Sequence, residues 1–82
     1  MAYSQIKQLT ILAEKISADA LSYEQIFDEL NRYNATPKEI GDIIHFLYHF
    51  ACDSDIRQKD KEYDVSQRQR LDDVILYLKN YE

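Results

Sequence analysis

The amino-acid sequence predicts an all-α fold: a small antiparallel four-helix bundle in a single domain, residues 1–82. Apolar residues recur at spacings of three and four along most of the chain, as in helices that bury one face. The chain contains only one Gly and one Pro. This composition argues against disorder and against a β-rich fold with many turns. A chain of 82 residues has room for one small core.

The first helix is predicted over about residues 3–15, and a second helix follows it. The apolar stripe of the first helix consists of Ile6, Leu9, Leu12, Ala13 and Ile16. The second helix has two suitable starts. Ser17 is one N-cap, and Ser22 is the other, with Gln25 completing a capping box. Either start leads into a helix whose apolar face carries Ile26, Phe27, Leu30 and Tyr33.

The third helix is predicted from Pro37 to about Ala51. Thr36 suits the N-cap, Pro37 the first turn, and Glu39 the capping-box position. The broad apolar face consists of Ile40, Ile43, Ile44, Leu47, Phe50 and Ala51. A helix this apolar is expected to lie at the centre of the bundle.

The last helix is predicted to begin at Ser66, where Gln69 completes a second capping-box pattern. Its apolar stripe consists of Leu71, Val74, Ile75, Leu78 and Tyr81. The connection over residues 52–65 is longer than the roughly 2–8 residues that usually join helices. It has room for a short extra turn.

The formal net charge is −5, from 15 acidic and 10 basic residues. This balance disfavours direct binding to nucleic acid or to an anionic membrane and favours a cationic protein partner. Cys52 is the only cysteine, so no internal disulfide forms, which fits the cytoplasm. The N-terminus lacks the apolar core of a signal peptide. The longest apolar stretch, IIHFLYHFAC, is too short for a bilayer.

The connection between the third and fourth helices is the predicted binding surface. Charged side chains and one tyrosine gather there, and binding residues often lie on connections held by a rigid scaffold. The candidate residues are Asp53, Asp55, Arg57, Asp60, Glu62, Tyr63 and Asp64. Tyr63 has two equally favoured roles: an interface residue, because tyrosine is enriched in hot spots, or an internal anchor for the connection.

No catalytic residue, metal or cofactor is predicted. The sequence has no glycine-rich phosphate loop, nucleophile elbow or Cys-x-x-Cys pair. His45, His49, Cys52 and Asp53 are acceptable zinc ligand types, but their spacing is common on helices and no second ligand pair lies elsewhere. The chain is therefore interpreted as a binding protein and not as an enzyme, with a metal-binding or small catalytic protein centred on His45, His49 and Cys52 as an alternative.

Two segments and the closing helix resemble the colicin D immunity protein family. In the first half, the run from Lys15 to Ala18, then Leu21 and Tyr33, looks like that family. In the second half, Leu47 and Phe50 precede an acidic turn with Asp53, Asp55 and Arg57, and the closing helix with Leu71, Val74 and Leu78 is similarly placed. Cys52 stands where the family often has a proline.

The resemblance implies a small helical protein that binds a co-encoded toxin domain and blocks its active site. Toxins that resemble colicin D are ribonucleases that cut transfer RNA, and related pairs occur in contact-dependent growth inhibition. The expected partner is therefore a basic nuclease domain, bound one-to-one by a monomer in the cytoplasm. Asp53, Asp55 and Arg57 are the positions that the resemblance assigns to binding. The competing interpretation is a general helical adaptor that binds through an apolar groove.

Overall fold

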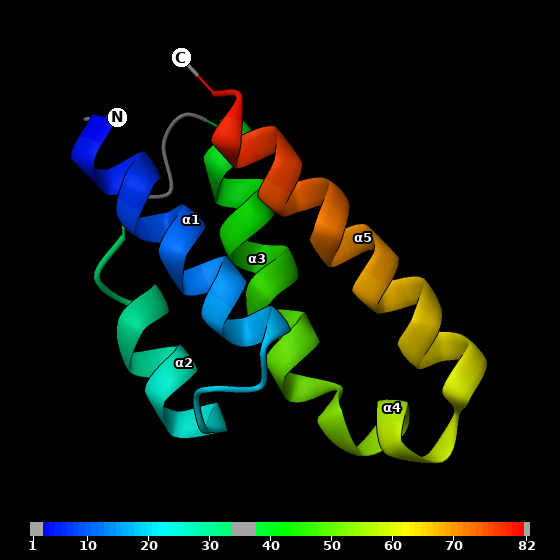
Figure 1. Cartoon of the computed structure of the whole chain (residues 1–82). Coiled ribbons are helices and arrows are strands. Elements are labelled where there is room, and N and C mark those ends of the chain that lie inside the picture. The colour runs from blue at the N-terminus through cyan, green and yellow to red at the C-terminus, as the bar shows by residue number, and fades with distance from the viewer. Residues whose placement is uncertain (1–2, 34–37, 82) are drawn as a thin grey trace.

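The computed structural model describes residues 3–33 and 38–81. Within these ranges the chain forms five α-helices and no strand (Figure 1). The helices are α1 (Tyr3–Ser17), α2 (Tyr23–Leu30), α3 (Lys38–Cys52), α4 (Ser54–Lys59) and α5 (Lys61–Lys79). The all-α bundle predicted from the sequence is confirmed, and the extra turn expected within residues 52–65 is present as α4.

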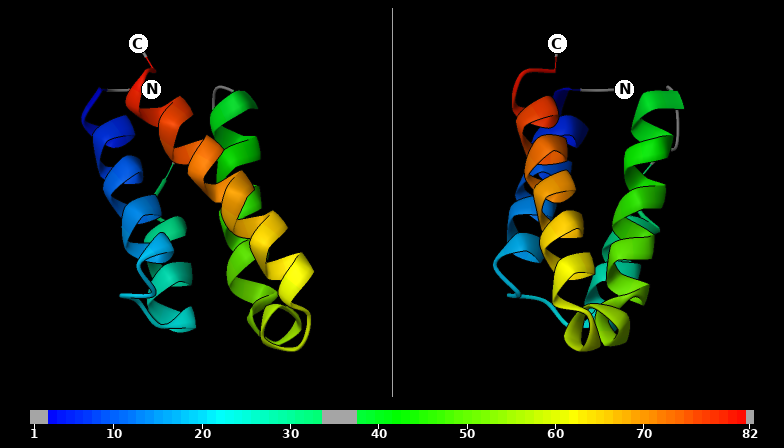
Figure 2. Two further views of the ribbon diagram at one scale, coloured as in Figure 1. Left: turned by 45° about the vertical axis from the view of Figure 1, so that its right-hand side comes forward. Right: turned by 90° about the vertical axis from the view of Figure 1, so that its right-hand side faces the viewer.

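The first and last helices form the most extensive helix–helix contact, between α1 and α5. The views in Figure 2 show that α1 begins and α5 ends at the same end of the molecule, whereas α4 lies at the opposite end. The second helix is only eight residues long, so the helices differ greatly in length. None of the helices in the described ranges is both long enough and apolar enough to cross a membrane.

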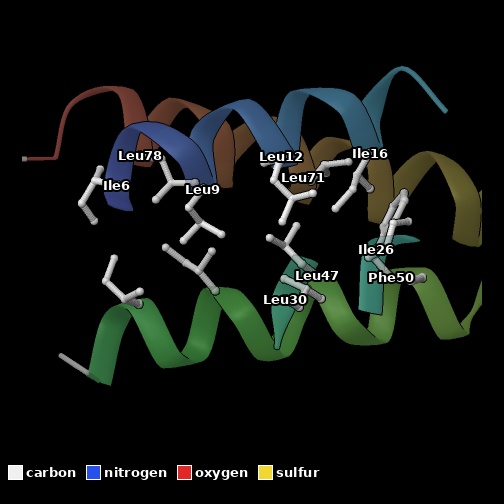
Figure 3. Packing of buried hydrophobic residues seen from close by; sticks show 14 residues of the cluster. Ile6, Leu9, Leu12, Ile16, Ile26, Leu30, Leu47, Phe50, Leu71 and Leu78 are labelled. Carbon is white, nitrogen blue, oxygen red and sulfur yellow. The ribbon is translucent and has the colours of Figure 1, made fainter. Parts of the chain in front are cut away.

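One hydrophobic cluster holds the helices together (Figure 3). Its buried members are Ile6, Leu9, Leu12, Ala13, Ile16, Ile26, Leu30, Ile40, Ile43, Leu47, Phe50, Ala51, Leu71 and Leu78. The apolar stripe predicted for the first helix is buried in full, and α3 contributes five of these residues. The apolar face of α3 shares this cluster with residues of α1, α2 and α5.

The second helix begins at the later of its two predicted starts. The Ser22 hydroxyl oxygen accepts a hydrogen bond from the Gln25 backbone N–H at 3.2 Å, and Gln25 Oε1 accepts one from the Ser22 N–H at 2.9 Å. Ser17 is instead the last residue of α1. The capping box at Ser22 is therefore confirmed. The N-cap predicted at Thr36 and Pro37 lies outside the described residues.

The predicted start of the last helix at Ser66 is wrong. The helix α5 begins at Lys61, and the Asp60 side chain caps it by accepting a hydrogen bond from the Tyr63 backbone N–H at 3.1 Å. Ser66 lies inside the helix as an exposed residue. The only buried residues of α5 are Leu71 and Leu78. Its first turns therefore project past the core, and no apolar repeat marks them in the sequence.

Candidate interaction surface

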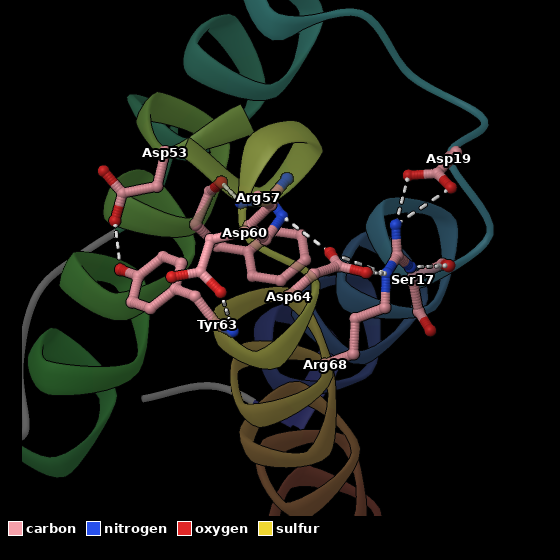
Figure 4. Close-up of polar contacts among 9 residues, drawn as sticks. Ser17, Asp19, Asp53, Arg57, Asp60, Tyr63, Asp64 and Arg68 are labelled. Carbon is pink, nitrogen blue, oxygen red and sulfur yellow. Dashed lines mark hydrogen bonds and ion pairs between the residues drawn. The ribbon is translucent and has the colours of Figure 1, made fainter. Parts of the chain in front are cut away.

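The seven predicted binding residues lie where α3 ends, α4 follows and α5 begins. Figure 4 shows Asp53, Arg57, Asp60, Tyr63 and Asp64 in this region. We call residues 52–64 the corner. Four of the seven side chains are half-buried and form contacts within the corner or to its neighbours: Asp53, Arg57, Tyr63 and Asp64. The other three, Asp55, Asp60 and Glu62, are exposed. The predicted set therefore divides into residues that hold the corner and residues that face outward.

Arg57 is the charged side chain that anchors the corner, with only 9% of its surface exposed. Its Cζ lies 3.6 Å from the centroid of the Phe50 ring, and Nη1 donates a hydrogen bond to the Phe50 carbonyl oxygen. Its Nε also lies 3.4 Å from Asp64 Oδ1. Burial lowers the pKa of the Arg57 guanidinium, and the Asp64 charge opposes that shift. Arg57 thereby connects the end of α3 to the beginning of α5.

Arg68 extends this network to the turn between α1 and α2. Its Nε lies 3.2 Å from Asp64 Oδ1, and its Nη2 lies 3.1 Å from Asp19 Oδ2. Its Nη1 also donates a hydrogen bond to the Ser17 carbonyl oxygen at 3.2 Å. Burial alone would lower the pKa of Arg68, but the hydrogen bonds and charges of Asp19 and Asp64 raise it overall.

Asp19 reaches Arg68 from an unusual backbone conformation. Its φ of 56° lies in the left-handed region, which aspartate tolerates better than most residues other than glycine. Neither Asp19 nor Arg68 was predicted from the sequence to belong to the site. The spacing of four between Asp64 and Arg68 was a usable signal for a helical ion pair. The contact with Asp19 spans 49 residues, and no local pattern predicts it.

Tyr63 lies across the corner and bonds to the end of α3. Its hydroxyl donates a hydrogen bond to Asp53 Oδ2 at 2.7 Å. This hydrogen bond, together with burial, raises the pKa of the Tyr63 hydroxyl above its ordinary value of 10.0. The contact fits the anchoring role, one of the two roles that the sequence left open for Tyr63.

This hydrogen bond predicts a specific loss of stability at high pH. A raised pKa means that the stability from the Tyr63–Asp53 bond is fully present below about pH 10 and is lost as the pH rises through the folded-state value. We expect Tyr63→Phe to flatten the fall of the urea midpoint above about pH 10. Asp53→Asn should have a similar effect because it removes the acceptor charge.

Part of the fall of the urea midpoint at high pH should remain in both variants. The pKa of Tyr23 is raised by its hydrogen bond with Cys52, and that of Tyr33 is raised by burial. An alkaline fall in Tyr63→Phe as steep as that of the wild-type chain would contradict the assignment. The measurement needs only urea titrations followed by circular dichroism at a series of pH values.

The outward-facing side of the corner carries charges of both signs. Asp55, Asp60 and Glu62 are exposed there, and so are Lys59 and Lys61. Asp60 is also the N-cap of α5, so its carboxylate has a structural task. Asp55 and Glu62 are therefore the predicted carboxylates best suited to contact a partner without disturbing the fold.

The two histidines and the cysteine considered for a metal site make separate contacts. His45 Nε2 and His49 Nε2 lie 3.0 Å apart on α3. Cys52 Sγ lies 3.6 Å from the Tyr23 hydroxyl of α2. Over residues 3–33 and 38–81, no group of three or more His, Cys, Asp or Glu side chains is arranged to hold a metal ion.

Comparison of the chain with protein-family models, with curated proteins and with solved structures finds no match. The function proposed below therefore rests on the sequence pattern, the charge distribution and the geometry of the corner.

Proposed function

We propose that this chain is an immunity protein that binds a cognate basic toxin domain, a ribonuclease that cuts transfer RNA, and covers its active site. The complex is one-to-one and forms in the cytoplasm, and the chain acts by binding alone. The observation that carries the proposal is the set of exposed carboxylates, Asp55, Asp60 and Glu62, on a corner fixed by internal contacts. The resemblance to colicin D immunity proteins supplies the class of partner.

The internal contacts of the corner support this role. Arg57 and Tyr63 hold the end of α3 against α5 from beneath. The backbone that carries the exposed carboxylates therefore needs little ordering when a partner binds, and ordering of loops is one of the main costs of association. A cleft that binds RNA presents Lys and Arg to phosphates. Carboxylates presented on a corner that internal contacts hold can occupy the same positions as the phosphates.

The overall charge supports rapid capture. A net charge of −5 attracts a basic domain over distances of about one Debye length, near 10 Å at 0.1 M salt. Such steering raises association rates, and its effect falls steeply with ionic strength. An antidote benefits from fast association because the toxin must be caught before it reaches RNA.

The direct test is to mix the purified chain with the C-terminal domain encoded by the gene directly upstream. Binding and ribonuclease activity are measured at low and high salt. We expect a tight one-to-one complex that suppresses RNA cleavage. The double variant Asp55→Lys/Glu62→Lys should slow association by roughly 10–100-fold at low salt. Its helical content should match that of the wild-type chain, because both side chains are exposed.

The matched control is Glu14→Lys/Asp72→Lys, which changes the net charge by the same amount at exposed positions on α1 and α5. It reports the effect of overall charge alone and should slow association much less. Equal slowing by both double variants would remove the corner from the interface. Asp60 is left intact because its loss would also uncap α5.

The competing function is a helical adaptor that binds through an apolar groove. A groove of about 460 Å³ lies between α1 and α2, where Ile11, Leu21 and Tyr33 stand among charged residues such as Lys15 and Asp28. Binding through its apolar residues would depend weakly on salt, whereas binding through carboxylates depends on it strongly. The salt series of the same experiment therefore separates the two functions.

A further inference from the structure

A row of five aromatic rings crosses from α2 to α3 on the surface, and we call it the aromatic belt: Tyr23, Phe27, Tyr48, His49 and His45. Ring centroids along the row lie 4.1, 4.5, 6.0 and 4.4 Å apart. Tyr23 is 49% exposed and Tyr48 is 45% exposed. Both histidines are exposed and Phe27 is half-buried. The belt is thus an ordered aromatic surface that remains largely open to solvent.

The hydrophobic core does not account for the belt. Tyr23, Phe27 and Tyr48 belong neither to the buried cluster nor to the partly buried residues packed against it. Tyrosine is among the residues most enriched in binding hot spots. It supplies a large contact area with few rotatable bonds, and the mutual contacts of these rings restrict them further. Such a surface is well suited to a protein partner.

The surroundings of the belt favour a cationic partner. On α2, the exposed Glu24 follows Tyr23 directly, and the helix sequence YEQIFDEL has no Lys or Arg. On the α5 side, a groove of about 500 Å³ contains Asp42 and Asp53 beside the two histidines. Its one cation, Arg70, lies over the ring of Phe46.

The chain's own cations leave the belt rings free. Within residues 3–33 and 38–81, the cation–π contacts fall on Phe46 and Phe50 and not on Tyr23, Phe27 or Tyr48. Lys and Arg bind the faces of aromatic rings, and Arg does so more often. The open rings and the carboxylates beside them together match the side chains that a basic surface presents.

We propose that the aromatic belt is a second contact surface for the basic domain of the proposed function. Tyr23 and Tyr48 receive Arg or Lys side chains of that domain on their ring faces, and this inference rests on the proposed function. The belt adjoins the corner, since Cys52 contacts Tyr23 and is followed directly by Asp53. A stable interface involves about 20–30 residues on each side, which is more than the corner alone contains.

A second copy of this chain is a poorer occupant. A two-fold symmetric contact places the same surface on both partners. It would place two surfaces that both carry carboxylates, such as Glu24 and Asp42, against each other, and like charges placed together oppose association. A basic domain meets the same carboxylates with opposite charge.

The test measures the dissociation constant of the complex with the upstream-encoded domain by isothermal titration calorimetry. Tyr23→Ala and Tyr48→Ala should each raise it about 10–30-fold, as expected for hot-spot residues. Tyr48→Phe keeps the ring and should bind within about threefold of the wild-type chain. Tyr77→Ala is the matched control, because Tyr77 is 44% exposed but lies near the end of α5.

Tyr48→Lys provides a variant that guards against misfolding, because lysine favours helices and exposed positions. It should weaken binding at least as much as Tyr48→Ala while circular dichroism stays unchanged. If the wild-type complex is tight and the Tyr23 and Tyr48 variants bind equally well, the belt is not a contact surface, and the proposed function still stands. No complex with the wild-type chain overturns both. A dimer in sedimentation that Tyr48→Lys disrupts assigns the belt to a second copy and overturns the proposal.

Discussion

Arg57→Ala should destabilise the fold by about 2–4 kcal/mol, the range for removing a largely buried, hydrogen-bonded charge. The substitution leaves the Phe50 carbonyl oxygen without its donor and uncovers the Phe50 ring. Asp64 keeps its contact with Arg68, which limits the loss to the lower part of the range for a broken buried pair. The measurement is urea unfolding, followed by circular dichroism, of the variant and the wild-type chain.

The control for Arg57 is another arginine in a simple ion pair. Arg32 lies 3.6 Å from Glu29, and their side chains are 73% and 41% exposed. Pairs of this kind contribute only about 0–1 kcal/mol, so Arg32→Ala should shift the midpoint little. Arg57→Lys should recover only part of the loss, because a single ammonium group cannot stack on the ring and donate in two directions as guanidinium does. Equal effects of the two alanine variants would show that Arg57 does not anchor the corner.

Leu47→Ala should destabilise the chain by about 3–5 kcal/mol, in the upper part of the range for buried leucines. Leu47 has 0% of its surface exposed and lies at the middle of α3, within the cluster shared by the helices (Figure 3). Close packing leaves little freedom for the neighbours to fill the space. A domain of this length has a total stability of about 4–12 kcal/mol. The variant should therefore lose a large share of its stability and unfold far below the wild-type midpoint.

The same substitution at an exposed position gives the comparison. Leu76 lies on α5 and is 61% exposed. Leu76→Ala should change the stability by less than about 0.5 kcal/mol, because alanine is at least as favourable in a helix and little packing is lost. Similar losses in the two variants would mean that Leu47 does not lie in the centre of the core. Thermal unfolding supplies an independent check, since 1 kcal/mol moves the midpoint by about 4–8 °C in a domain of this size.

The helices that bury a continuous apolar stripe could be predicted from the sequence. The first helix was expected over residues 3–15 and is observed as Tyr3–Ser17. The third was expected to end at about Ala51 and ends at Cys52. In both, buried residues recur with the helical period, so the pattern reports the packing directly. At Ser22, the cap and the first apolar residue stand together, and the capping box forms as predicted.

The start of α5 could not be found in this way. Ser66 and Gln69 repeat the spacing of Ser22 and Gln25, yet only the earlier pair begins a helix. The helix α5 begins earlier, with Asp60 as its N-cap, and residues 61–70 are mostly polar or charged and are partly buried or exposed. Where a helix extends past the core, no face is buried, so hydrophobic periodicity does not indicate the helix. A capping pattern taken alone does not decide between a helix start and a helix interior.

The candidate site shows a similar division. Local sequence placed the charged residues of the corner together, because they are adjacent along the chain. The local sequence does not show which carboxylates make internal contacts, because those contacts depend on Arg68 and on the Tyr63–Asp53 hydrogen bond. The aromatic belt also could not be predicted from the sequence. Its rings come from two helices, and only packing brings Phe27 beside Tyr48.

The contact between α1 and α5 also determines when the molecule can assemble. The first helix finds its most extensive partner in the last helix, so its apolar face stays uncovered on that side until nearly the whole chain is available. Closing a loop this long costs entropy before the contact stabilises it. In a nascent chain leaving the ribosome, the face of α1 that packs against α5 therefore stays exposed to solvent. The bundle is completed only after α5 has emerged.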